Sequence, residues 1–378
     1  MPARYRLAGN RARAANIVTG GIDRQSAFAG TKPALGALTL DPERLAGWMA
    51  DHVAGFEGPL AISQFKGGQS NPTYRLDAGS GRYVLRRKPP GDLLPSAHAV
   101  DREFMVQQAL GRTGFPVPHV HALETDEGVI GSMFYVMAFT PGRVIWEPAM
   151  PGLQPAQRGA VYDAMNRTLA DLHNIDPEAA GLGDFGRSDG YVARQVQRWS
   201  QQYRASADTP IEAMDRLIAW LPDNLPPEGP ARIVHGDFRL DNLILAPDEN
   251  RVAAVIDWEL STLGDPLADF TYHLMQWHMP TSKTGAGTGS LIGHDLAALG
   301  IPALDAYIAA YEKRTGFSVM PHLPVYFAYN FFRMAAILAG IVARARAGSA
   351  ANKNARLMEG EVRPLAETAW AFAQQAAS

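Results

Sequence analysis

The sequence predicts an α+β protein with a β-rich N-terminal half and a mostly helical C-terminal half. Three observations lead to this prediction. Short runs with β-like character cluster between residues 61 and 138, helical patterns dominate from residue 154 to 347, and a Pro- and Gly-rich segment separates them near 139–151. A chain of 378 residues, 47% hydrophobic and 19% charged, is also large enough for two lobes around a substantial core.

The N-terminal half begins with a helix predicted over 41–55, for which Asp41 is a plausible N-cap. Strands are predicted over 61–65, 73–78, 82–88, 117–123 and 132–138. Gly79-Ser80-Gly81 forms the hairpin turn between the second and third of these strands. A helix over 97–110 interrupts the series and ends at the Gly- and Pro-containing stretch that follows.

In the C-terminal half, helices are predicted over 154–173, 190–204, 211–221, 266–277, 302–315 and 323–347. Two short β-like runs, 242–246 and 252–256, lie beside an Asp-rich loop. The Gly-, Ser- and Thr-rich segment 281–290 is predicted to be a mobile surface loop. We therefore expect an N-lobe over 39–140, a C-lobe over 141–378, and a flexible extension over 1–38.

Composition excludes several classes of function. The absence of cysteine excludes disulfides, thiolate zinc sites and cysteine nucleophiles. A net charge of −3 gives no sign of a polyanion-binding surface, so no nucleic-acid partner is expected. The most apolar run, Phe331–Val342, contains Arg333 and is shorter than the ~20 residues that span a bilayer. We expect a soluble, cytoplasmic protein with no membrane partner.

Two segments near the middle of the C-terminal half carry the residue types that phosphoryl transfer requires. The first runs from His235 to Asn242 and includes Asp237, and the second contains Asp257 at the end of an apolar run. Phosphoryl transfer needs a carboxylate beside the acceptor hydroxyl and oxygen ligands for Mg²⁺ on the phosphates. The apolar runs after Asn242 and before Asp257 would anchor these side chains. The alternative is a solvated Asp/Asn loop beside a core histidine.

With the Ile256-Asp257-Trp258 that follows it, this loop resembles the signature of the aminoglycoside phosphotransferase and choline kinase superfamily. The resemblance implies a protein-kinase-like two-lobe fold, with a small antiparallel-sheet N-lobe carrying one helix and a larger, mainly helical C-lobe. It makes Asp237 the catalytic base and Asn242 and Asp257 the Mg²⁺ ligands, while His235 would hold the loop by hydrogen bonds. ATP and Mg²⁺ are the implied cofactors, and a small-molecule hydroxyl is the acceptor.

The N-terminal half contains residues that match the nucleotide site of that fold. Arg86, in a strand whose alternation places it on the same face as Val84, occupies the position of the kinase lysine and would contact ATP phosphates. Glu103, on the next helix, is the expected ion-pair partner of Arg86. The alternative is that Arg86 and Glu103 are ordinary surface charges.

Two backbone segments complete the expected nucleotide site. The turn with Gly67, Gly68, Ser70 and Asn71 is the candidate phosphate-covering loop, although taken alone it is only a glycine turn. The run from 135 to 139, with Met137 and Phe139, would form the hinge whose amides bind adenine, and a buried strand end explains it equally well. Further along, Asp265 opens the segment that braces the catalytic loop in the family, and it can also be a plain N-cap.

The run Tyr83–Arg87 and the helix segment Arg333–Gly340 look like the subgroup of phosphotransferase-like proteins associated with acyl-CoA dehydrogenases. From Pro266 onwards there are seven acidic and nine basic residues, which does not favour a polycationic aminoglycoside. Arg333, Arg344 and Arg346 would suit an anionic acceptor such as a hydroxyacyl-CoA. Alternatively, these arginines face solvent or pair with acidic side chains at Glu359, Glu361 and Glu367.

We therefore predict an ATP- and Mg²⁺-dependent small-molecule phosphotransferase. A pseudokinase-like module that binds a nucleotide or an acyl ligand without transferring phosphate is the alternative, supported by Arg86 in place of lysine. A dehydrogenase is disfavoured because no strand–GxGxxG–helix unit is present.

Overall fold

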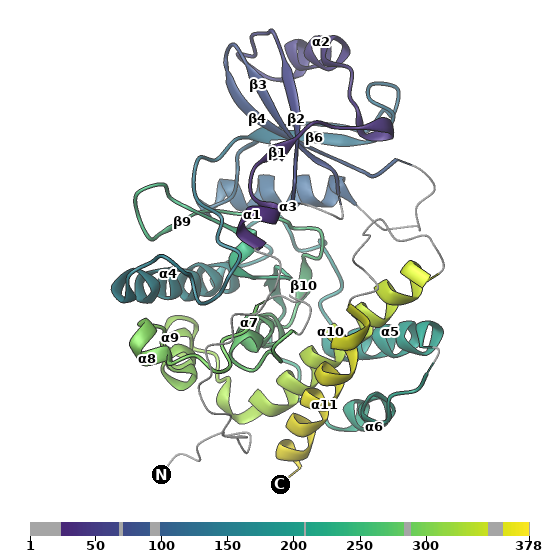
Figure 1. Cartoon of the computed structure of the whole chain (residues 1–378), viewed down its shortest axis with the longest axis vertical. Helices are drawn as coiled ribbons and strands as arrows, with labels where there is room; N and C mark the ends of the chain where they lie inside the picture. Colours follow the sequence, from purple (N-terminus) through teal and green to yellow (C-terminus); the bar gives the residue numbers. More distant parts are fainter. Residues whose placement is uncertain are drawn as a thin grey trace.

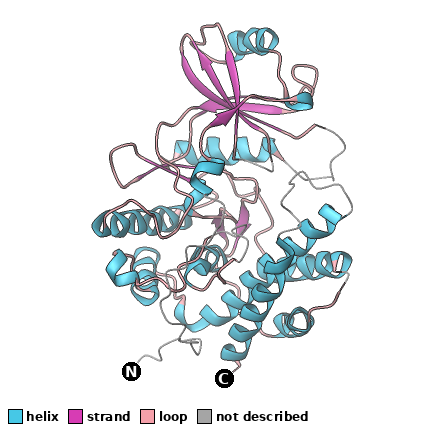
Figure 2. Cartoon of the chain, viewed as in Figure 1, coloured by secondary structure: helices cyan, strands magenta, loops and turns pink. Residues whose placement is uncertain are grey.

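The computed structural model describes residues 24–67, 71–90, 99–207, 209–282, 289–346 and 358–377. The chain forms a small lobe built on a β-sheet above a larger lobe of helices (Figure 1). Figure 2 shows most of the strands in the upper lobe and most of the helices in the lower one. The predicted two-lobe α+β fold is confirmed.

The N-lobe is a six-stranded antiparallel sheet with the strand order β1-β2-β3-β4-β6-β5. Its strands are β1 (Thr31–Lys32), β2 (Ala61–Phe65), β3 (Thr73–Ala78), β4 (Gly81–Arg87), β5 (Val120–Glu124) and β6 (Phe134–Ala138). The hairpin turn between β3 and β4 pairs Ala78 with Gly81, as expected. Strand β5 begins three residues later than predicted, beyond Pro118, because proline has no N–H to donate to a ladder.

Alternation along β4 gives the sheet two apolar faces. Tyr83 and Leu85 pack with helix α2 (Pro42–His52) in one cluster, whereas Val84 packs with Met137 and helix α3 (Val100–Arg112) in another. Asp41 caps α2 by accepting hydrogen bonds from the N–H groups of the first turn. Helix α3 lies between the sheet and the C-lobe in Figure 1. It was predicted over 97–110 and ends two residues later, at Arg112.

The expected flexible extension contains ordered elements in its described part. Helix α1 (Arg24–Phe28) precedes β1, which pairs with β2 through Thr31 and Phe65. The sheet therefore begins before the predicted lobe boundary at residue 39. A two-residue edge strand leaves no periodicity in a sequence, so pattern reasoning had no means of finding β1.

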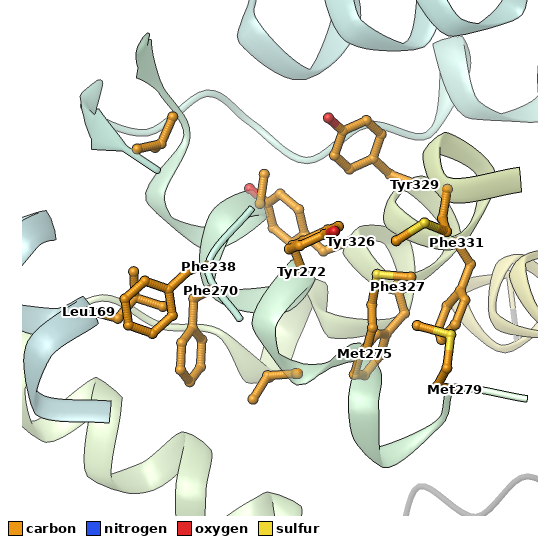
Figure 3. Packing of buried hydrophobic residues seen from close by; sticks show 14 of the residues in the cluster. Leu169, Phe238, Phe270, Tyr272, Met275, Met279, Tyr326, Phe327, Tyr329 and Phe331 are labelled. Carbon is orange, nitrogen blue, oxygen red and sulfur yellow. The ribbon is translucent and has the colours of Figure 1, made fainter. Parts of the chain in front are cut away.

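The C-lobe is built on helix α10 (Leu323–Arg346), which packs against α5, α7 and α11. The other helices are α4 (Pro155–Asn174), α5 (Tyr191–Ser206), α6 (Glu212–Trp220), α7 (Pro266–Leu274), α8 (Leu296–Leu299), α9 (Leu304–Thr315) and α11 (Glu359–Ala376). Figure 3 shows Phe270 and Tyr272 of α7 together with Tyr326, Tyr329 and Phe331 of α10 in one group of buried side chains. The sequence prediction missed α11, whose buried Val362, Leu365 and Ala369 have helical spacing and cover α10.

Helix α10 corrects the expectation that the most apolar run of the chain is too short to span a bilayer. Residues Met320–Arg346 form a continuous helical stretch that is long and apolar enough to cross a membrane by length and composition. Of its most apolar window, 72% is buried inside the protein. Its apolar character therefore matches its position as the central helix of the C-lobe core.

Two small antiparallel sheets of the C-lobe support the segment that contains Asp237 and Asp257. Strands β8 (Leu243–Leu245) and β9 (Val252–Val255) form a hairpin, and β7 (Arg232–Val234) pairs with β10 (Thr262–Gly264). The first pair was predicted, with slightly longer strands, whereas the three-residue strands of the second pair were not. Together they fix both ends of the segment that contains Asp237 and Asp257.

Candidate active site

The β8–β9 hairpin brings Asn242 and Asp257 to the same end of the C-lobe. Leu243 pairs with Val255, so the residue before β8 and the loop after β9 lie side by side. The N–H of Ile256 donates to the carbonyl of Asn242 at 3.0 Å, which ties the two segments directly together. Asp257 has a positive φ of 68°, an uncommon conformation for a residue other than glycine. Such local strain is typical of functional sites.

The loop that carries Asp237 is braced from α7 and α10. Asp269 accepts hydrogen bonds from the N–H groups of His235, at 2.7 Å, and Gly236, at 2.9 Å. Arg333 Nη2 donates to the carbonyl of Gly236 at 2.8 Å. Gly236 has a φ of 82°, and a Cβ there would lie 2.7 Å from the carbonyl oxygen of Leu260. Only glycine fits this turn without displacing its neighbours.

His235 holds the loop, as the resemblance implied. The backbone nitrogen of Asp237 lies 3.2 Å from Nδ1 of His235, and a backbone N–H can only donate a hydrogen bond. Nδ1 is therefore the acceptor, and Nε2 carries the proton that is donated to the carbonyl of Ile256 at 3.0 Å. His235 thus links the Asp237 loop to the residue before Asp257, and a solvated loop is excluded.

The carboxylate of Asp237 is fixed by three side chains. Its Oδ1 accepts a hydrogen bond from Tyr272 at 2.6 Å and pairs with Arg239 Nε at 2.9 Å. Asn242 Nδ2 approaches Oδ2 at 3.2 Å. Burial raises the pKa of Asp237, while Arg239 and the hydrogen bond from Tyr272 act in the opposite direction. The arrangement holds one carboxylate in a defined orientation, as a base must be held.

Asn242 and Asp257 have the oxygen atoms that a Mg²⁺ ion prefers. The amide nitrogen of Asn242 is engaged by the carbonyl of Asp237 at 2.9 Å as well as by its carboxylate, so the amide oxygen Oδ1 is the atom left for a cation. Within the described residues, no group of three or more His, Cys, Asp or Glu side chains forms a complete metal cage. Mg²⁺ commonly binds through one or two protein oxygens together with substrate phosphates, so this donor set fits it.

Arg86 of the N-lobe reaches across to this site. Its Nε pairs with Glu103 at 2.7 Å and its Nη2 pairs with Asp257, while Glu259 lies 3.8 Å away. The side chain of Arg86 is 7% exposed and that of Glu103 is 1% exposed, so the alternative of ordinary surface charges is excluded. The predicted Arg86–Glu103 ion pair is confirmed.

The predicted phosphate-covering loop is only partly described. Gly68 and Ser70 lie outside the described residues, while Gly67 approaches the ring of Trp146, which would stand 3.3 Å from a Cβ on that glycine. Asn71 is fully buried, and its Nδ2 donates to Glu103 at 2.7 Å. Without nucleotide, the amide of Asn71 bridges Glu103 and Glu259, and its role at the phosphates stays a prediction.

The hinge residues lie at the end of β6. The side chain of Met137 is buried beside Val84, on the sheet face that carries Arg86. The N–H of Phe139 donates to the carbonyl of Arg82 at 3.3 Å, and the N–H of Ala138 donates to that of His119 at 2.7 Å. The predicted adenine donor at Phe139 is thus already used by a neighbouring strand, which favours the buried-strand-end interpretation for this amide. Met137 stays a candidate apolar wall.

A pocket lies beside the catalytic loop on the C-lobe side. Its polar lining includes Arg239, Asp241 and Tyr272. Its apolar lining includes Trp146, Leu240, Met275, Met279 and Met334. Arg346 pairs with Glu359 at 2.5 Å, as the alternative interpretation held, and Arg333 is buried against Gly236. Neither arginine lines this pocket as the cationic wall that would suit an anionic acceptor.

Several residues of the site were not singled out from the sequence. They are Arg239, Tyr272 and, as a member of the carboxylate cluster, Glu259. Asp269 belongs to the segment that was expected to brace the catalytic loop, and its hydrogen bonds to His235 and Gly236 confirm that expectation. Asp269 and Tyr272 stand three apart on α7 and therefore share a helix face toward the loop. Asp265 is an N-cap, accepting from the N–H of Leu267 at 2.8 Å, as its alternative interpretation held.

Comparisons with known proteins agree with this geometry. Residues 61–323 match the model of the phosphotransferase enzyme family. A solved structure from Ralstonia eutropha, provisionally assigned as an aminoglycoside phosphotransferase, is 45% identical, with a TM-score of 0.80 over 89% of this chain and 99% of that one. A macrolide 2'-phosphotransferase of type I shares the fold at 19% identity, with a TM-score of 0.56 over 86% of this chain and 98% of that one.

The curated relatives include two longer proteins. The chain is 44% identical to acyl-CoA dehydrogenase family member 10 of Mus musculus over 84% of its own length and 29% of the relative's. It is 41% identical to acyl-CoA dehydrogenase family member 11 of Homo sapiens over 87% of its own length and 42% of the relative's. The chain thus spans less than half the length of each of these two relatives.

Proposed function

The chain belongs to the phosphotransferase enzyme family, and from this premise we propose that it transfers the γ-phosphate of ATP, with Mg²⁺, to a hydroxyl group of a small molecule. The observation that carries the proposal is the meeting of Asp237, Asn242 and Asp257 at one end of the β8–β9 hairpin, with Arg86 reaching them from the other lobe. A module that only binds a ligand has no need of all three polar residues brought together in this way.

In the proposed reaction, Asp237 accepts the proton of the acceptor hydroxyl while the hydroxyl oxygen bonds to the γ-phosphorus. The bond between that phosphorus and the oxygen bridging to ADP breaks, and ADP leaves. Asn242 Oδ1 and Asp257 would hold the Mg²⁺, whose chemistry is to neutralise charge on the phosphates. Arg86 would release Asp257 and bind phosphate oxygens, for which a guanidinium is well suited.

We propose an anionic or acyl-CoA-linked metabolite as the acceptor. Two observations support this class over an aminoglycoside. The pocket beside the catalytic loop includes Met275, Met279 and Met334 in its lining, which suits an apolar acyl group better than a polycation. In addition, the relatives named acyl-CoA dehydrogenase family members contain a region similar to almost the whole of this chain.

Titration calorimetry of Mg-ATP tests the nucleotide site. We expect micromolar to sub-millimolar binding that depends on Mg²⁺ and that Asp257→Asn weakens at least tenfold, because the charge is lost while asparagine tolerates the positive φ. Asp248→Asn is the matched control, since Asp248 is exposed in the turn of the same hairpin. Absence of binding to the folded wild-type chain would refute the proposal.

A screen of acceptors then tests the substrate class. Hydroxyacyl-CoA thioesters and hygromycin B would be incubated with Mg-ATP, and ADP release and phosphorylated product would be measured. Efficient phosphorylation of hygromycin B with none of the thioesters would reject an acyl-CoA acceptor while leaving the phosphotransferase assignment intact. Mg-ATP binding without transfer to any acceptor would favour the binding-module alternative, for which the enclosure of Arg86 by Glu103, Asp257 and Glu259 is the structural support.

A further inference from the structure

The segment Arg24–Lys32, which we name the N-terminal strap, connects both lobes. On the N-lobe side, Lys66 donates its N–H to the carbonyl of Gly30 at 3.1 Å, and Thr31 pairs with Phe65. On the C-lobe side, Gln25 Nε2 donates to the carbonyl of Val144 at 3.1 Å. In Figure 1, α1 lies between the sheet and the C-lobe helices, in agreement with these contacts.

The strap holds one aromatic side chain in particular, Trp146. Gln25 Oε1 accepts the backbone N–H of Trp146 at 3.3 Å, so Gln25 bonds to the 144–146 segment in both directions. The rings of Phe28 and Trp146 lie 4.9 Å apart. The indole of Trp146 also lies against Gly67, where the ring would stand 3.3 Å from a Cβ. Trp146 is thus held between the strap and the glycine turn of the N-lobe.

Trp146 is also a wall of the pocket beside the catalytic loop. The same pocket is lined by Arg239 and Tyr272, the two side chains that fix Asp237 Oδ1. A continuous set of contacts therefore runs from the strap through Trp146 to the space next to the catalytic carboxylate. A loop residue with a large ring has many conformations available, and contacts on two sides remove that freedom.

We propose that the N-terminal strap is part of the acceptor site, where it fixes Trp146 as a wall that limits the size of the acceptor and the entry of water. Trp146 is then a specificity-determining residue, and Gln25 and Phe28 are positioning residues that act through it. The inference rests on the proposed phosphotransfer at Asp237. It assigns a function to a segment that the sequence predicts to be a flexible extension.

The test uses water as the acceptor, because water is present whatever the natural acceptor is. Phosphate release from Mg-ATP without added acceptor is measured for wild type, Phe28→Ala, Trp146→Ala and the double variant. We expect each single variant to raise hydrolysis at least threefold with the KM for ATP within twofold, and the double variant to add little. Leu35→Ala is the control, because Leu35 is 77% exposed. A rate of phosphate release equal to that of wild type in both single variants would overturn the proposal.

Failure of the proposed function is distinguished from failure of the strap. If the wild-type chain neither binds nor hydrolyses Mg-ATP, phosphotransfer is refuted, and the acceptor role of the strap falls with it. If it binds Mg-ATP, hydrogen exchange measured by mass spectrometry gives a second, activity-free readout on the full chain. The double variant Gln25→Ala/Phe28→Ala should then speed exchange of the Trp146 amide at least tenfold, and unchanged exchange would show that the strap does not hold this residue.

Discussion

Arg86 on strand β4 of the N-lobe pairs with Asp257 on the loop after strand β9 of the C-lobe, and the same guanidinium also pairs with Glu103 at 2.7 Å. One buried cation therefore connects the sheet, helix α3 and the proposed metal ligand. In the proposed nucleotide complex, the Arg86–Asp257 contact would be exchanged for contacts of Arg86 with phosphate and of Asp257 with Mg²⁺. The ion pair keeps both groups oriented in the nucleotide-free protein.

The first prediction concerns the stability of this ion pair. Arg86→Met leaves Glu103 buried without its cation, and removing one partner of a buried pair costs about 3–5 kcal/mol. We expect urea denaturation to show a loss of this order. The double variant Arg86→Met/Glu103→Gln should recover part of the loss, because the uncompensated charge is removed. Equal stability of the single and double variants would show that Glu103 takes up a proton once Arg86 is removed.

The second prediction separates catalysis from folding at Asp237. Asp237→Asn removes the base while keeping a similar shape, and a positioned base contributes ~10²–10⁴ in rate. We expect turnover to fall at least a hundredfold, with Mg-ATP affinity within threefold of wild type. ADP release and calorimetry on the same preparation measure the two quantities. An equal loss of turnover in the control Asp248→Asn would instead indicate a general effect of the hairpin.

The third prediction concerns the pH dependence of turnover. Asp237 must be ionised to accept a proton, and burial raises its pKa above the ordinary value. Turnover should therefore be full above this raised pKa and fall as the pH drops through it. The hydrogen bond from Tyr272 lowers the pKa of Asp237, so Tyr272→Phe should move the acid limb of the kcat–pH profile to higher pH. A shift to lower pH, or none, would contradict this role of Tyr272.

Much of this site can be predicted from the sequence because its signals are local. The order of the Arg86 strand, the Glu103 helix and the Asp237–Asn242 loop points to one fold, and apolar runs mark the arms of the β8–β9 hairpin. What could not be predicted depends on tertiary contacts. Tyr272 stands 35 residues from Asp237 in a helix whose pattern is that of a core element, and only the packing of α7 brings its hydroxyl to the carboxylate.

The strap and Asn71 show the same limit. The Arg- and Gly-rich start of the chain has the composition of a flexible segment, and two residues of edge strand do not alter that pattern. Asn71 was assigned to the phosphate-covering turn by its place after the glycines. The sequence does not reveal that its side-chain amide also donates a hydrogen bond to the buried carboxylate of Glu103, because that contact depends on where helix α3 packs.

The last prediction concerns stability in mild acid. Burial lowers the pKa of His278, packed against Phe327 and Phe372, to about 4, and burial likewise lowers the pKa of His273 to about 4. In the unfolded chain a histidine titrates near 6.5, so between these values the unfolded state binds more protons than the folded state. By linkage, the free energy of unfolding decreases as the pH falls from about 6.5 toward 4, by on the order of 3 kcal/mol for each histidine as an upper limit.

His278→Leu removes one of these groups while keeping an apolar contact with the two rings. The difference in unfolding free energy between pH 7 and pH 5, measured by urea denaturation, should therefore be smaller in His278→Leu than in wild type, and His294→Leu serves as an exposed control. An unchanged difference in His278→Leu would mean that His278 is protonated as readily in the folded protein as in the unfolded chain.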